Sequence, residues 1–126
     1  MGWEYFQGSC YLFTDHQKTW SDAMQYCRDK GGDLLKVTSE DEKNFVRRSG
    51  KKWWLALRRD VTHKDIFKWN DGSLLTFQFW NQNEPNNKQE ECGESQSTGK
   101  WNDISCNINR AIACEKGKYS LMNSRF

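Results

Sequence analysis

The stretch WNQNEPNNKQEECGESQSTGKWNDISC, residues 80–106, decides the fold of this 126-residue chain. It contains the only proline of the sequence, Pro85, and two of the five cysteines, Cys92 and Cys106. Most of it belongs to a polar segment over residues 75–100, which is too long for an ordinary connection between elements. Loops of this length in compact domains are usually either functional or disordered. We therefore expect a binding loop here.

The sequence on both sides of this loop predicts an α+β domain. An aromatic segment over residues 5–13 with a Gly-Ser break indicates a strand pair. Two helices are expected next, over residues 19–30 with Thr19 as the N-cap, and over residues 39–49 with Ser39 and Glu42 as a capping box. The first helix should bury Trp20, Ala23, Met24 and Cys27, and the second Phe45 and Val46. Apolar runs at 53–57, 66–69, 101–104 and 110–114 predict strands.

The composition predicts a single packed domain. Hydrophobic residues make up 36% and aromatic residues 14% of the chain, which argues against disorder. We expect one domain over 1–126, with a core at about 3–115 and a short C-terminal tail over 116–126. The net charge of +2 favours no class of partner. No apolar run is long enough for direct membrane insertion, and no nucleic-acid-binding module is recognisable.

The five cysteines (Cys10, Cys27, Cys92, Cys106 and Cys114) include no CxxC pair, which disfavours zinc ribbons and thioredoxin-like motifs. Wide spacing in a short chain fits a secreted or cell-surface domain with two disulfides and one cysteine left over. Five reduced cysteines in a cytosolic core are the alternative that composition leaves open.

Carboxylate and amide side chains in residues 80–106 suggest a site for a hard cation. Calcium takes six to eight oxygen ligands and tolerates irregular loop geometry better than magnesium does. The cluster lacks histidine, which disfavours zinc, copper and iron. A merely polar surface loop is the competing interpretation. The candidate ligands are Glu84, Asn86, Glu90, Asn102 and Asp103.

The sequence gives little support to an enzyme. The two histidines, His16 and His63, lie outside any catalytic motif, and no G-x-S-x-G elbow occurs. The adjacent Glu90 and Glu91 could in principle form a glycosidase pair, but neighbouring loop carboxylates are more simply metal ligands. We therefore predict that the chain is not an enzyme.

Several motifs together resemble the carbohydrate-recognition domain of C-type lectins: residues 54–57 (WLAL), 84–86 (EPN) and 101–103 (WND), with four of the cysteines in order. The resemblance extends from Trp3 to Glu115. It implies a C-type lectin-like fold, with two helices packed on small antiparallel sheets and a long calcium-binding loop. It also implies the disulfides Cys27–Cys114 and Cys92–Cys106, and an extracellular domain, either secreted or part of a cell-surface receptor.

The resemblance further implies one sugar-binding calcium ion on the five candidate ligands. Glu84, Asn86, Glu90 and Asn102 would also hydrogen-bond the sugar. The order Glu-Pro-Asn implies mannose-, fucose- or N-acetylglucosamine-type ligands, with a cis Glu84–Pro85 bond. The expected partners are glycans on cells or microbes, and oligomerisation would add avidity.

The chain departs from the family pattern at three places. Arg59 and His63 occupy positions that are acidic in relatives with an auxiliary calcium site, and Asn87 replaces a third acidic ligand. We therefore predict that the auxiliary calcium is absent. Cys10 lacks its usual partner, which would precede Met1.

The segment over residues 47–68 suggests an alternative function. It contains eight basic and two acidic residues. Such a charge excess could attract a protein or a sulfated, anionic ligand to a lectin-like domain. An ordinary solvated surface is the commoner explanation of such a segment.

Overall fold

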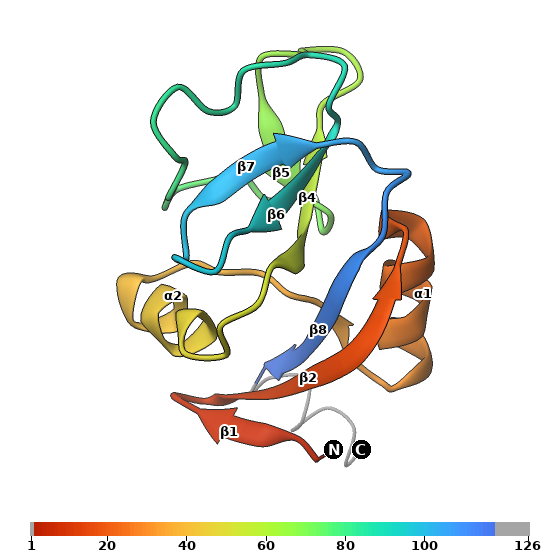
Figure 1. Ribbon diagram of the computed structural model, residues 1–126, viewed down its shortest axis with the longest axis vertical. Helices are drawn as coiled ribbons and strands as arrows, with labels where there is room; N and C mark the ends of the chain where they lie inside the picture. The colour runs from red at the N-terminus through yellow and green to blue at the C-terminus, as the bar shows by residue number, and fades with distance from the viewer. Residues whose placement is uncertain (1, 118–126) are drawn as a thin grey trace.

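A computed structural model describes residues 2–117, so most of the expected C-terminal tail lies outside the described residues. The elements in chain order are β1 (Glu4–Phe6), β2 (Ser9–Lys18), α1 (Trp20–Asp29), β3 (Asp33–Leu34), α2 (Glu40–Arg47), β4 (Trp53–Arg59), β5 (Phe67–Trp69), β6 (Cys92–Ser95), β7 (Trp101–Ile104) and β8 (Arg110–Gly117) (Figure 1). No helix among residues 2–117 has the length and apolar character needed to cross a membrane.

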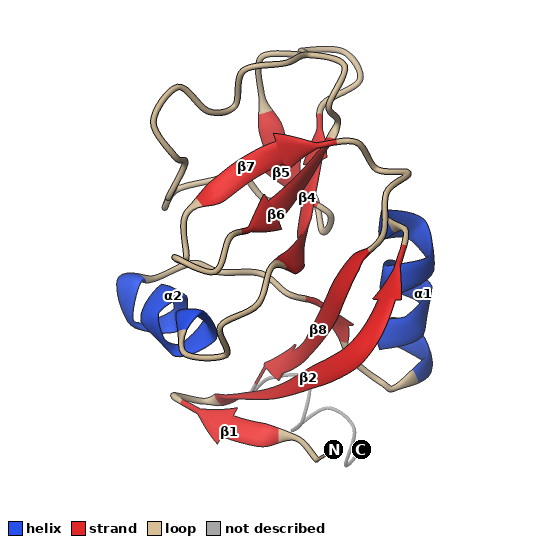
Figure 2. Cartoon of the chain, in the orientation of Figure 1, coloured by secondary structure: helices blue, strands red, loops and turns tan. Residues whose placement is uncertain are grey.

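The strands form one connected sheet in the order β1-β2-β8-β4-β6-β7, with β3 on β8 and β5 on β4. Its pairings are antiparallel except for β4 and β8, which meet in parallel at the single pair Trp53 and Ala111. This contact joins a lower ladder (β1, β2, β8, β3) to an upper ladder (β4–β7), and both helices flank the lower part (Figure 2). The α+β fold class is confirmed, although the small sheets are joined into one.

Helix α1 buries the face that its sequence predicts: Trp20, Ala23, Met24 and Cys27. The predicted cap is only half right, because Thr19 has the extended N-cap conformation but its side chain makes no capping hydrogen bond. The start of the helix is held by a tertiary contact instead, since the backbone N–H of Trp20 donates to the carbonyl of Cys106 at 3.1 Å.

Helix α2 has one half of the predicted capping box. The Ser39 hydroxyl accepts a hydrogen bond from the backbone N–H of Glu42 at 3.1 Å. The Glu42 carboxylate does not return to Ser39. It accepts from the backbone N–H of Thr38 at 2.8 Å and from the Tyr11 hydroxyl at 2.5 Å. Val46 is buried, whereas Phe45 is half-buried and packs against the edge of the core.

The two disulfides are Cys27–Cys114 and Cys92–Cys106, which confirms the predicted pairing. The first ties α1 to β8 and the second ties β6 to the residues after β7. In the chain-entropy model, loops of these lengths stabilise a protein by about 4–5 and about 3 kcal/mol. Cys10, in β2, is a free thiol.

An aromatic cluster surrounds Trp101, the first residue of β7. Trp101 is fully buried and meets the rings of Trp69, Phe79 and Trp80 edge-on, with centroids 5.6 Å apart in each case. Such edge-to-face pairs contribute about 0.5–1.5 kcal/mol each beyond area burial. The next residues along β7, Asn102 and Asp103, are therefore carried by a rigid base.

Strand β6 was not predicted, because residues 75–100 were interpreted as one loop. All four of its residues are buried. A Cβ on Gly93 would lie 3.0 Å from Leu57, so glycine lets β6 approach β4 closely. Glu94 is buried with its charge matched, because Arg110 Nε donates to its Oε1 at 2.6 Å and Gln96 donates to its Oε2. The true loop is thus shorter and ends at Glu91.

Candidate functional site

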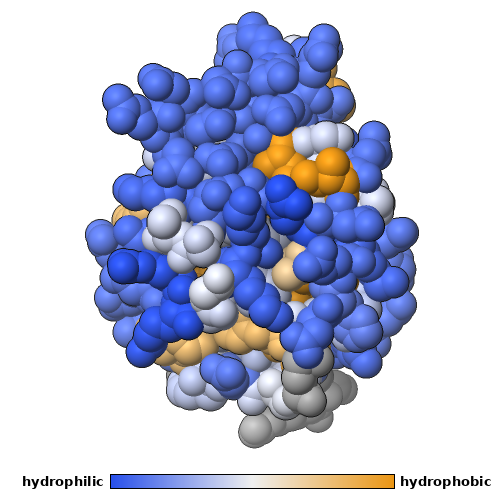
Figure 3. Space-filling view, in the orientation of Figure 1, coloured by the Kyte–Doolittle hydropathy of each residue, from blue (hydrophilic) through white to orange (hydrophobic). Residues whose placement is uncertain are grey.

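The candidate site lies at the loop end of the molecule, which faces away from β1 (Figure 1). Two connections build it: residues 60–66 between β4 and β5, and residues 70–91 between β5 and β6. The surface at this end is hydrophilic on the face shown in Figure 3. Glu84 and Asn86 lie on the second connection, across a Glu84–Pro85 bond that is cis, as the resemblance implies. Glu90 lies two residues before β6, and Asn102 and Asp103 lie in β7.

Asp103 is the hub of the site. It is 3% exposed, and β6–β7 pairing places it opposite Gly93. One carboxylate oxygen, Oδ1, accepts from the backbone N–H of Asn86 at 3.3 Å. The other, Oδ2, accepts from the N–H of Asn87 at 3.0 Å and from Arg59 Nη2 at 2.8 Å. The chain just after Pro85 is thereby tied to β7.

Two of the candidate carboxylates, Glu84 and Glu90, have raised pKa values. Burial raises the pKa of Glu84 to about 7, and hydrogen bonding to Asp103 and the negative charges of Asp103 and Glu90 add to the rise. Burial and the charge of Asp103 also raise the pKa of Glu90. The Oε2 atom of Glu84 is buried and has no hydrogen-bond partner. A group in this situation favours either a proton or a cation.

The donor set fits a calcium ion. Of the three candidate carboxylates, Asp103 pairs with Arg59, which leaves the charges of Glu84 and Glu90 for a divalent cation to neutralise. All candidate ligand atoms are hard oxygens, as calcium prefers. Within residues 2–117, no three His, Cys, Asp or Glu side chains are grouped closely enough to hold a metal ion, so Glu84, Glu90 and Asp103 do not converge on one point in this structure.

Hydrogen bonds tie Asp103 to the backbone of Asn86 and, through Arg59, to the backbone of Glu90, whereas Asn102 has a different partner. Its Oδ1 accepts from Asn81 Nδ2 at 2.8 Å. Asn81 is itself anchored, because its backbone N–H donates to the carbonyl of Trp101 at 2.9 Å. Asn81 thus orients the Asn102 amide, a role that sequence reasoning missed. Nothing distinguishes Asn81 from the other polar residues of its segment.

The auxiliary positions are occupied by protein contacts. Arg59 is 5% exposed, and its guanidinium donates to the carbonyl of Lys64 and to Asp103. His63 is exposed, and its backbone N–H donates to Asp60 at 3.1 Å. Hydrogen bonds from Lys68 and from the backbone of His63 and Thr62 hold the pKa of Asp60 well below its usual range. The acidic side chain nearest in sequence to Arg59 is therefore already engaged.

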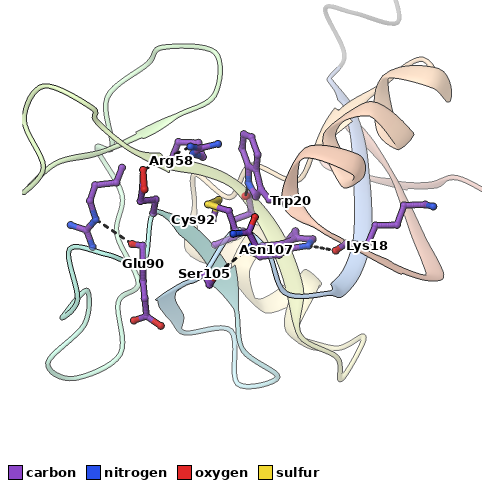
Figure 4. The surroundings of a disulfide bond; sticks show 12 residues. Lys18, Trp20, Arg58, Glu90, Cys92, Ser105 and Asn107 are labelled. Atoms are coloured by element: carbon purple, nitrogen blue, oxygen red, sulfur yellow. Dashed lines mark hydrogen bonds and ion pairs between the residues drawn. A yellow bond between two sulfur atoms is a disulfide. The ribbon is translucent and has the colours of Figure 1, made fainter.

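The basic segment over 47–68 does not present all its charges as one surface. Arg59 is buried, while Lys51 pairs with Asp15 at 2.9 Å and Lys68 with Asp60 at 2.9 Å. Arg58 lies over the Trp20 ring, 4.9 Å from its centroid, beside Cys92 of the second disulfide (Figure 4). Arg48 likewise lies over the Phe45 ring, so five of the eight cations are engaged within the protein, which weakens the alternative of an anionic ligand.

Comparison with known proteins places the chain in a family. A family model described as Lectin C-type domain matches residues 16–116. CD209 antigen-like protein C of Mus musculus is 38% identical over 94% of this chain, which spans 69% of that protein. CD209 antigen of Macaca mulatta is 37% identical over 94% of this chain, which spans 31% of it. The cow CD23 carbohydrate-recognition domain, solved in the presence of a GlcNAc2Man3 oligosaccharide, superposes with a TM-score of 0.83 at 31% identity, covering 91% of this chain and 92% of that one.

These matches also bear on activity. The family consists of carbohydrate-binding, non-enzymatic proteins, in agreement with the prediction that the chain is not an enzyme. With a family model covering most of its residues and a relative matched over most of both lengths, this chain belongs to the C-type lectin domain family.

Proposed function

We propose that this carbohydrate-binding domain holds its sugar through one calcium ion ligated by Glu84, Asn86, Glu90, Asn102 and Asp103. The observation that carries the proposal is the excess of negative charge at the loop end, with the unpartnered Oε2 of Glu84 at its centre. A fold alone does not fix a function, so the argument rests on this site. Bound calcium would supply the missing positive charge and open coordination positions for two sugar hydroxyls.

The side chains themselves would select the sugar. A hydroxyl placed between a carboxylate and an amide donates to the first and accepts from the second. Glu84 with Asn86 offers one such pair, and Glu90 with Asn102 offers the other. This order suits the vicinal hydroxyls of mannose-, fucose- and N-acetylglucosamine-type sugars. The oligosaccharide present with the cow CD23 domain contains mannose and N-acetylglucosamine, which supports this choice.

The setting that fits this function is extracellular, in a secreted protein or a receptor ectodomain. Two disulfides and relatives among the CD209 antigens support that location. The partners would be glycans on cells or microbes. A site that grips one diol should bind a monosaccharide with a Kd of about 1 mM, or about −4 kcal/mol. Oligomerisation of the parent protein would then raise the avidity.

Titration with methyl α-mannoside tests the proposal. Binding is followed by heteronuclear NMR of the assigned domain. We expect saturable binding in calcium and no binding in EDTA. Shifts should centre on the five ligand residues. Methyl α-galactoside is the matched control ligand and should bind more weakly. Undiminished mannoside binding in EDTA would contradict the calcium mechanism.

A further inference from the structure

We infer that the Arg59 guanidinium is a built-in cation that holds the ligand loop in its binding conformation before any metal is bound. Arg59 is thus a positioning residue: it acts on Asp103 and on the backbone around Asn87 and Glu90. The calcium part of this inference rests on the proposed function. The part that concerns the metal-free loop does not.

One guanidinium joins three separate segments. Its Nη1 donates to the carbonyl of Lys64 at 2.6 Å, in the β4–β5 connection. Its Nη2 donates to the carbonyl of Asn87 at 3.0 Å, and its Nε to the carbonyl of Glu90 at 3.2 Å, both in the β5–β6 connection. Nη2 also donates to Asp103 in β7 at 2.8 Å. The backbone of Arg59 adds a third tie to the β5–β6 connection, since its N–H donates to Glu91 O at 2.8 Å.

The chemistry of arginine is needed for this arrangement. The guanidinium is planar, keeps its charge and offers five donors in a fixed geometry, whereas lysine has one compact ammonium group. The side chains of Arg59 and Asp103 are 4% and 0% exposed, so neither could rely on water. A buried ion pair is stable only when further hydrogen bonds satisfy its remaining atoms, and here three carbonyls do so. The Phe67 ring lies against the guanidinium, 4.5 Å from its centre.

The network fixes the atoms that matter for metal binding. Because Arg59 holds Asp103 Oδ2, that carboxylate is oriented to accept from the N–H groups of Asn86 and Asn87. Those contacts place the Glu84–Asn86 segment beside β7. Calcium then meets a loop that is already held beside β7 and does not have to order it, and preorganisation of this kind removes an entropic cost from binding.

Hydrogen exchange in EDTA tests the metal-free part directly. We would compare wild type with Arg59→Gln, Arg59→Lys and the control Arg58→Gln. Arg58 is the preceding residue of β4 and its loss removes the same charge, but its side chain lies over Trp20 and reaches the loop only through a half-exposed ion pair with Glu91 at 4.0 Å. Amides of the β2–β8 ladder report whether each variant is folded.

In EDTA, wild type and Arg58→Gln should protect the amides of Asn86 and Asn87 from exchange. Both Arg59 variants should lose that protection by about tenfold or more while the β2–β8 ladder stays protected. If Arg59→Gln fails to fold, Arg59→Lys carries the comparison. Equal loop protection in wild type and Arg59→Lys would overturn the inference, as would an unprotected loop in metal-free wild type.

Calorimetry with calcium supplies the second arm. Arg59→Lys keeps the charge, so its calcium affinity reports the geometry alone, and we expect it to fall by about 3- to 10-fold. In wild type, calcium should change loop protection little, whereas in Arg59→Lys it should restore it. A wild-type domain that binds no calcium would defeat the proposed function but leave the EDTA comparison valid. Wild-type loop protection that rises as steeply with calcium as in the variant would overturn the inference.

Discussion

Two buried carboxylates at adjacent register positions of neighbouring strands, Glu94 in β6 and Asp103 in β7, differ in how their charge is matched. Glu94 is 4% exposed and is matched within the framework by Arg110 and Gln96. Asp103 is 3% exposed and is matched by Arg59, but Glu84 and Glu90 lie close enough to leave an excess of negative charge. Protein groups alone match the charge of Glu94, whereas we propose that the carboxylates at the loop end bind an added cation.

Asp103→Asn should have the largest effect of any single change. It removes the partner of a buried guanidinium, which costs about 3–5 kcal/mol when one member of a buried pair is deleted. It also removes a proposed ligand, so calcium and mannoside binding should be lost. Denaturant unfolding and calorimetry measure the two effects. The matched Glu94→Gln should lower stability by a smaller amount, because Arg110 is more exposed, and should leave calcium binding intact.

Calcium should raise the free energy of unfolding of the whole domain. Ligand at 100 times its Kd stabilises a folded protein by about 2.7 kcal/mol. Thermal unfolding in calcium and in EDTA should show this gain in wild type and in Glu94→Gln. A gain of the same size in Asp103→Asn would show that calcium binds elsewhere.

The sequence allows the candidate ligands and the disulfides to be proposed, but it does not show the tertiary contacts that hold them in place. The EPN and WND motifs and the cysteine order point to the ligands and the disulfides, because these depend on residue type at fixed spacing. The buried strand β6 was missed, since Cys-Gly-Glu-Ser is buried only through Arg110 and the Gly93–Leu57 fit, both of which are tertiary. Asn81 and the four acceptors of Arg59 were missed for the same reason. Thr19 was wrongly given a capping bond, because Cys106 supplies the contact from elsewhere in the chain.

The double change Glu84→Gln with Asn86→Asp should alter the sugar preference of the site while calcium still binds. It exchanges the positions of acceptor and donor around one sugar hydroxyl while keeping oxygen ligands for the ion. We expect the preference for mannoside over galactoside to shift by about tenfold or more, or about 1.4 kcal/mol. Competition assays with both monosaccharides measure it. Retained calcium binding with an unchanged preference would refute this account of selectivity.

Glu115 in β8 offers a test outside the candidate site. Burial raises its pKa to about 8 in the folded protein, above its unfolded value. Its contribution to stability is therefore fully present below its unfolded pKa and is lost as pH rises through about 8. The slope from one such group cannot exceed about 1.4 kcal/mol per pH unit. Urea unfolding between pH 5 and 8 should show a flatter slope for Glu115→Gln. The difference should be the same in calcium and in EDTA, because Glu115 lies in β8.

The most direct test of the central claim is crystallography of the domain grown in calcium, with anomalous data to locate the ion. The account predicts one peak at the loop end, with oxygens of Glu84, Asn86, Glu90, Asn102 and Asp103 at about 2.3–2.6 Å, and the Arg59 guanidinium still bound to Asp103. A structure saturated with calcium that shows no ion among these residues, or an ion in place of the Arg59 guanidinium, would contradict it.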